Sequence, residues 1–164
     1  MTEMDLTIGT IEDNFKLVYC REEEIVKILE CLSEHPFVFV YASAGNGKTA
    51  FGVEFRERVP GAVLILGSQL ELEDINAIGL YNENFDQARI IIVDELDARL
   101  DKIRDNIENL LSKGKKFIFM VHYPKNRYIK WREQNQEYLE PIVCLVNDYP
   151  DTPWLHLTKY NENH

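Results

Sequence analysis

The stretch Ala42-Ser43-Ala44-Gly45-Asn46-Gly47-Lys48-Thr49 decides the fold of this chain. An apolar run, Phe37 to Tyr41, precedes it, and a sequence that favours a helix, Thr49 to about Val59, follows it. Strand, glycine-rich loop and helix in this order are typical of a loop that binds phosphate groups. The glycines let successive backbone N–H groups point at one anion, and the dipole of the following helix adds positive potential there.

Each residue of this loop has an expected role. The residues expected to contact the phosphates of a nucleotide are Ser43, Ala44, Gly45, Asn46, Gly47, Lys48 and Thr49. Lys48 is expected to reach the β- and γ-phosphates and to act in catalysis, while the Thr49 hydroxyl ligates Mg²⁺. Ala42 stands where the usual pattern has glycine, a substitution that many such loops accept. The motif therefore predicts binding of a nucleoside triphosphate, with Mg²⁺ as cofactor.

An acidic pair follows a second apolar strand. The run from Ile90 to Val93 leads directly into Asp94 and Glu95. A continuous β-branched run is typical of a buried parallel strand, and the carboxyl ends of such strands carry the site. We expect Asp94 beside the Mg²⁺ held by Thr49, and Glu95 to orient the water that attacks the γ-phosphate. An acidic helix N-cap is the alternative role for the pair, but the phosphate loop favours the catalytic role.

The length of 164 residues predicts a single domain over residues 1–164, long enough to bury a good core. Its expected parts are an N-terminal segment and helix over 1–35, a nucleotide-binding core over 36–125, and a C-terminal helix and strands over 126–164.

Composition points to a cytoplasmic protein with no membrane partner. The 45% hydrophobic and 28% charged residues are ordinary for a soluble globular protein. No apolar run approaches the length that spans a bilayer, and the N-terminus lacks the pattern of a signal peptide. Cys20, Cys31 and Cys144 form no Cys-x-x-Cys pair, so we expect reduced thiols rather than disulfides or zinc ligands.

The net charge of −10 constrains the partners, because a protein that neutralises many phosphates is usually basic overall or has a clear basic face. One segment is locally basic, with Lys125, Arg127, Lys130 and Arg132 interleaved with Tyr123, Tyr128 and Trp131. Basic residues with aromatics suit single-stranded nucleic acid. The alternative, which we favour, is a solvated helix whose Tyr128 and Trp131 face the core. Nucleic acid stays a partner to be tested.

Strands and helices are expected to alternate along the chain. We expect helices over 21–34, 49–59, 96–111 and 128–139, and strands over 37–42, 62–66, 89–93 and 117–121, with at least one more strand from 142–146 and 154–158. A short helix over 71–78 and a loop over 81–87 complete the assignment. This alternation predicts a three-layer α/β/α sandwich with a mostly parallel sheet of five or more strands, of the P-loop NTPase type.

The phosphate loop and the acidic pair resemble those of P-loop NTPases with a catalytic glutamate, the ASCE class. In that class the strand after the acidic strand inserts beside the phosphate-loop strand. The resemblance therefore implies that 117–121 lies next to 37–42 and that His122 points at the γ-phosphate, as a polar sensor of the nucleotide state. Local hydrogen bonding at a strand end is the alternative role for His122.

A narrower resemblance covers about residues 15–125. The stretch Val18 to Ile25, the run Asp94-Glu95-Leu96-Asp97 and the strand that ends at His122 are similar to STAND and origin-recognition-type members of the AAA+ group, although Cys20 stands where that group usually has glycine. Those families continue into a helical lid, whereas the residues after His122 look more strand-like. The chain therefore also resembles RecA-like or viral and phage-type ATPases that lack a lid.

These likenesses imply an ATP-binding, Mg²⁺-dependent ATPase that drives or switches a protein or nucleic-acid partner, as a homo-oligomer or within a larger assembly. Ring-forming ATPases present an arginine to a neighbour's nucleotide, and Arg127 and Arg132 lie on that side, with a solvent-facing position as the alternative for both. Two other functions stay open. One is a small-molecule kinase of the nucleoside type, and the other is a nucleotide-dependent regulatory or packaging subunit with little turnover.

Overall fold

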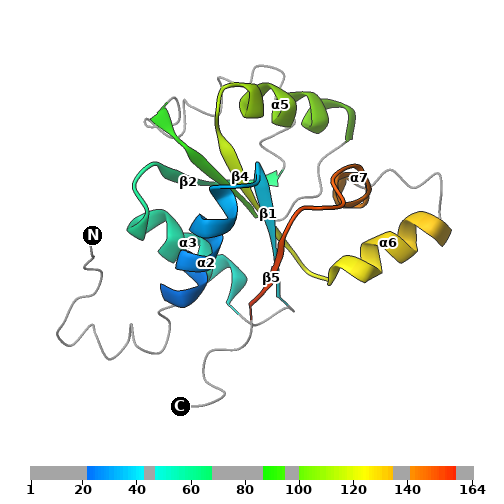
Figure 1. Cartoon of the computed structure of the whole chain (residues 1–164), viewed down its shortest axis with the longest axis horizontal. Coiled ribbons are helices and arrows are strands. Elements are labelled where there is room, and N and C mark those ends of the chain that lie inside the picture. Colours follow the sequence, from blue (N-terminus) through cyan, green and yellow to red (C-terminus); the bar gives the residue numbers. More distant parts are fainter. Residues whose placement is uncertain (1–21, 43–46, 68–86, 95–99, 135–140, 158–164) are drawn as a thin grey trace, which may run out of the picture.

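The computed structural model describes residues 22–42, 47–67, 87–94, 100–134 and 141–157. Within these ranges a parallel sheet of five strands, in the order β2-β3-β4-β1-β5, lies between two layers of helices (Figure 1). The strands are β1 (Phe37–Tyr41), β2 (Ala62–Leu66), β3 (Ile90–Asp94), β4 (Lys116–Val121) and β5 (Trp154–His156). The expected α/β/α sandwich is confirmed.

The register places the functional strand ends side by side. β4 pairs with β1 in parallel, from Phe37 opposite Phe117 to Tyr41 opposite Val121. The expectation that 117–121 lies beside 37–42 is therefore confirmed. β3 pairs with the other side of β4. Because all three strands run in the same direction, their last residues, Tyr41, Asp94 and Val121, lie at one edge of the sheet.

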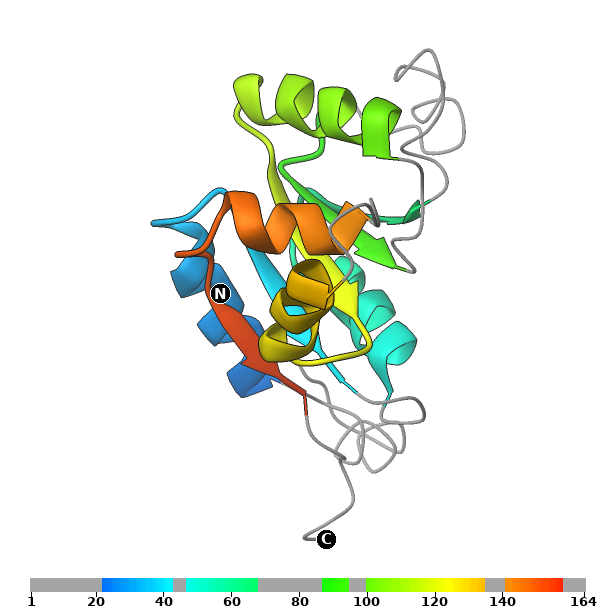
Figure 2. The ribbon, with the colours of Figure 1, turned by 90° about the vertical axis from the view of Figure 1, so that its right-hand side faces the viewer.

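Two groups of helices cover the two faces of the sheet (Figures 1 and 2). One face carries α2 (Glu22–Leu32) and α3 (Lys48–Arg58), and the other carries α5 (Leu100–Ser112), α6 (Lys125–Gln134) and α7 (Pro141–Asp148). Each group shares a separate apolar core with the sheet face beneath it. In α2, Ile25, Ile28 and Leu32 are buried at helical spacing, whereas Leu29 is 38% exposed.

Strand β1 reads as a continuous apolar run because both of its faces are covered. Phe37 and Phe39 belong to the core under α5, α6 and α7, while Val38 and Val40 belong to the core under α2 and α3. All four side chains are 0% exposed. This burial fixes the position of the strand that leads into the phosphate loop.

Helix α3 lies very close to the sheet because residue 52 is glycine. A Cβ added to Gly52 would lie 2.9 Å from Cε of Met120 and 3.3 Å from Cδ1 of Leu64. The missing side chain lets the helix backbone pack directly over β2 and β4. This close packing positions the first turn of α3 relative to the strand ends.

Of the two segments expected to supply at least one more strand, 154–158 contains β5, whereas 142–146 forms no strand and lies in α7. Residues 142–146 are all buried, and a short run that is apolar throughout does not distinguish a buried helix from a buried strand. Pro141 is the first residue of the helix, a position that needs no backbone N–H donor. Exposed side chains of Arg104 and Asp148 form an ion pair between α5 and α7. The part after His122 thus contains two helices and one described strand.

Several element boundaries also differ from the expected ones. Helix α6 begins at Lys125, directly after Pro124, instead of at residue 128. The expected helix over 71–78, most of the loop over 81–87, and residues 96–99 and 135–139 of two expected helices lie outside the described residues. Cys31 and Cys144 are free thiols, as predicted. In the described part of the chain, no helix combines the length and the apolar character needed to cross a membrane.

Candidate nucleotide-binding site

The first turn of α3 is built to face an anion. Gly47 precedes it with φ 82° and ψ 27°, a left-handed conformation that favours glycine. Its carbonyl accepts the first helical hydrogen bond, from the N–H of Phe51 at 2.8 Å. No side chain caps the N-terminus, and the first turn contains no acidic residue. The backbone N–H groups and the positive end of the helix dipole are thereby available to a phosphate group.

Thr49 and Asp94 connect the start of α3 to the end of β3. The Thr49 hydroxyl donates a hydrogen bond of 2.9 Å to Oδ2 of Asp94. Asp94 is only 4% exposed. A buried carboxylate needs compensating partners, and a hydroxyl is a weak partner for a full negative charge. A hydroxyl and a carboxylate are oxygen ligands of the kind that Mg²⁺ prefers, so the two side chains fit the metal that the sequence predicts.

Lys48 and His122 connect the same helix turn to the end of β4. Nζ of Lys48 lies 3.0 Å from Nδ1 of His122. An ammonium group only donates hydrogen bonds, so Nδ1 of His122 is the acceptor in this contact. This bond joins residues that are 74 positions apart in sequence. It places His122 at the residue expected to bind the β- and γ-phosphates.

The other predicted loop residues and Glu95 are not placed by the structure. Ser43, Ala44, Gly45, Asn46 and Glu95 lie outside the described residues. What the structure does bring together, from three different elements, is Gly47, Lys48 and Thr49 with Asp94 and His122. Two hydrogen bonds across the carboxyl edge of the sheet define this site.

Helix α6 contains the residues of the basic and aromatic segment except Tyr123, which precedes the helix. Tyr128 is 2% exposed, and Trp131 packs against the core while partly exposed, so the prediction that both face the core is confirmed. Arg127 is exposed, and its guanidinium carbon lies 4.6 Å from the ring centre of Tyr123 and 5.3 Å from that of Trp131. Arg132 also lies in α6, but its side chain is outside the described part.

Two features at this edge of the sheet were not predicted from the sequence. One is the direct bond between Lys48 and His122, and the other is the stacking of Tyr41 on His156, with ring centres 4.5 Å apart and planes 15° apart. The stacking depends on the pairing of β1 with β5, which aligns Tyr41 with His156. The residues around Tyr41 or around His156 do not by themselves indicate how β1 and β5 are aligned. For the position of Arg127 over the rings of Tyr123 and Trp131, the sequence offered one indication, the alternation of basic and aromatic residues after Tyr123.

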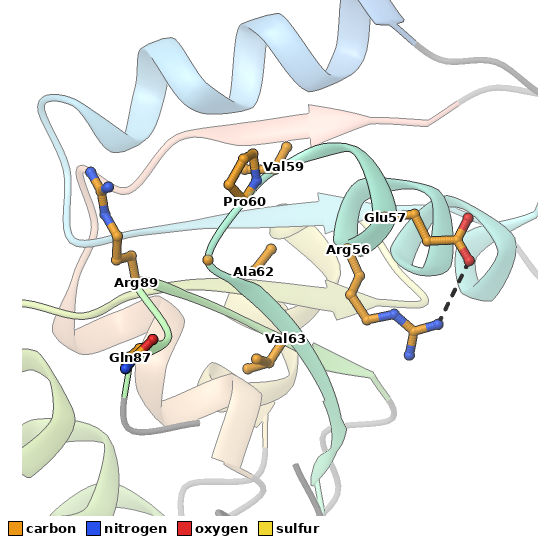
Figure 3. A pocket seen from close by; sticks show the side chains of 9 residues that line it. Arg56, Glu57, Val59, Pro60, Ala62, Val63, Gln87 and Arg89 are labelled. Atoms are coloured by element: carbon orange, nitrogen blue, oxygen red, sulfur yellow. Dashed lines mark ion pairs between the residues drawn. The ribbon is translucent and has the colours of Figure 1, made fainter. Parts of the chain in front are cut away.

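A separate hollow lies at the opposite edge of the sheet. Its volume is about 550 Å³, and it lies between the C-terminal turn of α3 and the starts of β2 and β3 (Figure 3). Pro60, Ala62 and Val63 form an apolar part of the wall, flanked by Arg56 and Arg89. Since Asp94 and His122 lie at the carboxyl ends of their strands, this hollow is not the phosphate site.

No protein-family model matches the chain, and no curated protein matches its sequence. Its structure is similar to that of a Pif1 helicase, solved in work on DNA unwinding at forked double-stranded DNA by two coordinating Pif1 helicases. The TM-score is 0.52 at 17% sequence identity, and the match covers 84% of this chain and 43% of the helicase chain. The chain thus matches less than half of the length of that protein.

The parallel sheet, the helices on both faces and this likeness define an α/β fold of the P-loop NTPase type. At this level of identity the likeness concerns the fold alone.

Proposed function

We propose that the chain is an ATP-binding protein and a Mg²⁺-dependent ATPase of the class with a catalytic glutamate. The observation that carries the proposal is the hydrogen bond from Thr49 to the buried Asp94, directly beside Lys48 at the start of α3. A hydroxyl, a buried carboxylate and a lysine at a helix N-terminus are the groups that P-loop enzymes use for a nucleotide and its metal.

The side chains have distinct roles in this proposal. Lys48 and the N–H groups of the loop and the first turn of α3 hold the phosphates, while Thr49 and Asp94 hold Mg²⁺. Bound Mg²⁺ supplies positive charge that offsets the charge developing on the phosphate oxygens. Glu95, the next residue after Asp94 in sequence, orients the attacking water, and His122 senses the γ-phosphate through its contact with Lys48.

ATP hydrolysis is proposed to drive or switch a partner. The Pif1 helicases of the similar structure unwind forked double-stranded DNA as two coordinating molecules. This supports the proposal that the present chain has a nucleic-acid partner and assembles in more than one copy. Arg127 and Arg132 stay candidates for an arginine finger in such an assembly, and the exposed position of Arg127 is compatible with that role. A cytoplasmic location belongs to the same proposal.

The test is a phosphate-release assay on the parent chain and two variants, combined with nucleotide binding. Lys48→Ala is expected to abolish binding or turnover. Glu95→Gln is expected to bind ATP as the parent does and to hydrolyse it about 10²- to 10⁴-fold more slowly, because it removes the group that positions the water. The matched control is Glu108→Gln, the same chemical change at an exposed position of α5, which is expected to leave the rate unchanged.

Addition of single-stranded DNA or of a nucleoside separates the alternatives. Stimulation by DNA supports the proposed function, whereas ADP production that requires a nucleoside indicates a kinase. Tight ATP binding without turnover indicates a regulatory or packaging subunit. Turnover by Glu95→Gln at the rate of the parent would refute the assignment of the water-positioning residue.

A further inference from the structure

The end of β4 links the phosphate site to helix α6 through two successive residues. His122 contacts Lys48 at 3.0 Å. The next residue, Tyr123, donates its backbone N–H to the hydroxyl of Tyr128 in α6 at 3.3 Å. The rings of Tyr123 and Tyr128 also meet edge to face, with centres 6.1 Å apart. A change in position of His122 therefore acts directly on the residue that holds the first turn of α6.

Tyr123, which precedes α6, and Arg127 and Trp131 of α6 form a cluster of planar groups, called the outer stack below. The guanidinium of Arg127 lies over both rings, and the two rings are 5.5 Å apart at 75°. Tyr123 is 39% exposed and Arg127 is exposed, so the outer stack combines planar aromatic and planar cationic surfaces that face solvent. Tyr128, beneath it, is buried and supports the stack from the core side.

The charge of α6 is opposite to that of the chain as a whole. Its ten residues contain four basic side chains and one acidic side chain, whereas the chain carries a net charge of −10. Arg127 and Lys130 are exposed, and among the described residues neither takes part in an ion pair. Lys125 instead donates to the carbonyl oxygen of Pro150 at 2.8 Å. The cations next to the outer stack are therefore available to an anionic partner.

We propose that the outer stack and Lys130 bind single-stranded nucleic acid, with an affinity that depends on the nucleotide state of the phosphate site. The guanidinium of Arg127, which lies over the ring of Tyr123, is proposed to stack on a base, and Lys130 to meet the phosphate backbone. Planar stacking surfaces favour unpaired bases over an acidic protein surface, which offers charge without planar rings. The dependence on nucleotide rests on the proposed function, whereas binding of the single strand does not.

The nucleotide state is proposed to affect binding of the single strand through Lys48, because this lysine contacts His122 and is also proposed to bind the phosphates. Phosphate groups draw the ammonium of Lys48 toward the loop and weaken its bond to His122. His122 then changes position, and the adjoining Tyr123 carries the change into the outer stack. Because coupling between two binding sites is reciprocal, a bound single strand changes nucleotide affinity by the same factor.

The first experiment measures binding of a fluorescein-labelled oligothymidylate of about 20 nucleotides by anisotropy, without nucleotide and at low salt. Arg127→Lys keeps the charge but loses the planar stacking group, and it is expected to weaken binding about 5- to 150-fold, the range of one stacked base. Lys130→Ala is expected to weaken binding and to reduce the dependence on salt by about one phosphate contact. Lys113→Ala removes an exposed lysine at the opposite edge of the sheet and is expected to bind as the parent does.

Equal affinity of Arg127→Lys and the parent would overturn the proposal, as would absence of binding by the parent at low salt. If the parent fails to bind the oligonucleotide but forms oligomers that Arg127→Lys disrupts, the surface contacts another copy and the proposal is also overturned. Tyr123→Ala, checked for an unchanged thermal unfolding transition, gives a second variant of the stack with the same expected direction.

The second experiment repeats the titration with Mg²⁺ and a non-hydrolysable ATP analogue. The parent is expected to change its oligonucleotide affinity by about 5-fold or more when the analogue binds, whereas His122→Ala is expected to show the same oligonucleotide affinity with and without bound analogue. A parent affinity that does not respond to bound analogue would refute the coupling. If the analogue itself does not bind while Arg127-dependent oligonucleotide binding persists, the proposed ATPase fails and the binding surface stands.

Discussion

Replacement of Asp94 by Asn distinguishes the contribution of this side chain to folding stability from its proposed contribution to metal binding. Asp94 is 4% exposed and accepts the Thr49 hydroxyl at 2.9 Å. Asparagine has nearly the same shape, and its amide oxygen accepts the same hydrogen bond, but it places no negative charge in the interior. Without ligand, Asp94→Asn is therefore expected to leave the free energy of unfolding unchanged within about 1 kcal/mol, or to raise it.

Removal of the donor has the opposite effect on the free protein. Thr49→Val keeps the approximate side-chain shape but leaves the carboxylate of Asp94 without its hydroxyl partner. An unsatisfied buried acceptor costs about 1–3 kcal/mol, so the melting temperature is expected to fall by about 2–12 °C for a domain of this size. The two variants thus differ in their effect on stability although they change the two partners of one hydrogen bond.

The two variants differ in the stability of the free protein, but they are expected to respond alike to nucleotide. In the parent, Mg²⁺ and a non-hydrolysable ATP analogue at a hundred times the dissociation constant add about 2.7 kcal/mol, which raises the melting temperature by about 5–11 °C. Both variants are expected to lose most of this increase, because Thr49→Val removes one proposed oxygen ligand of the metal and Asp94→Asn removes the negative charge of the other. The stability of the free protein and the response to ligand are therefore independent readouts.

Thermal unfolding followed by circular dichroism, with and without the analogue, gives both readouts. Asp105→Asn makes the same chemical change at an exposed position of α5 and is expected to keep the full response to nucleotide. An Asp94→Asn variant that keeps the full increase with Mg²⁺ and analogue would show that the metal is held elsewhere. A loss of more than about 2 kcal/mol in the free variant would show that the carboxylate is structural.

Three further predictions concern the backbone and packing of the same elements. Gly47→Ala forces a side chain into a left-handed conformation at φ 82°, so it is expected to cost about 1–2 kcal/mol in chemical denaturation and to weaken binding of the ATP analogue in the same titration. Phe119→Ala removes a side chain that is 0% exposed and in ring contact with Phe37, Phe39 and Phe117, with an expected loss of about 3–5 kcal/mol; a loss below 1 kcal/mol would contradict the described core. Arg104→Ala breaks an exposed ion pair with Asp148, and denaturation is expected to show a change of less than about 1 kcal/mol, because solvent screens such pairs.

The sequence predicts most of the site because its signals are local. The glycines before Lys48 and the apolar run before Asp94 determine a loop and a strand end within about ten residues each. The approach of Asp94 to Thr49 then follows from the rule that parallel strands end at one edge of the sheet. The position of His122 beside the phosphate site, though not its bond to Lys48, was predicted with one further assumption, the insertion of β4 beside β1, which came from a resemblance and not from the residues themselves.

What the sequence did not predict depends on tertiary packing. Residues 142–146 have the composition of a buried strand, but they form a helix because they fill the space above β1 and β4 next to α6. The arrangement of Arg127 over Tyr123 and Trp131 likewise depends on where α6 begins, three residues earlier than its pattern indicates. In both cases the local pattern permits two conformations, and contacts with distant residues select one.

The position of β1 in the sheet has a consequence for the synthesis of the chain. β1 leaves the ribosome before the other described strands, yet both of its neighbours come later, β4 at 116–121 and β5 at 154–156. Until β4 has been made, the run Phe-Val-Phe-Val-Tyr has no sheet partner in the described chain and presents an unpaired apolar strand. Such late, non-local pairing slows folding, so the nascent chain is expected to depend on holding chaperones and to aggregate when truncated before residue 116.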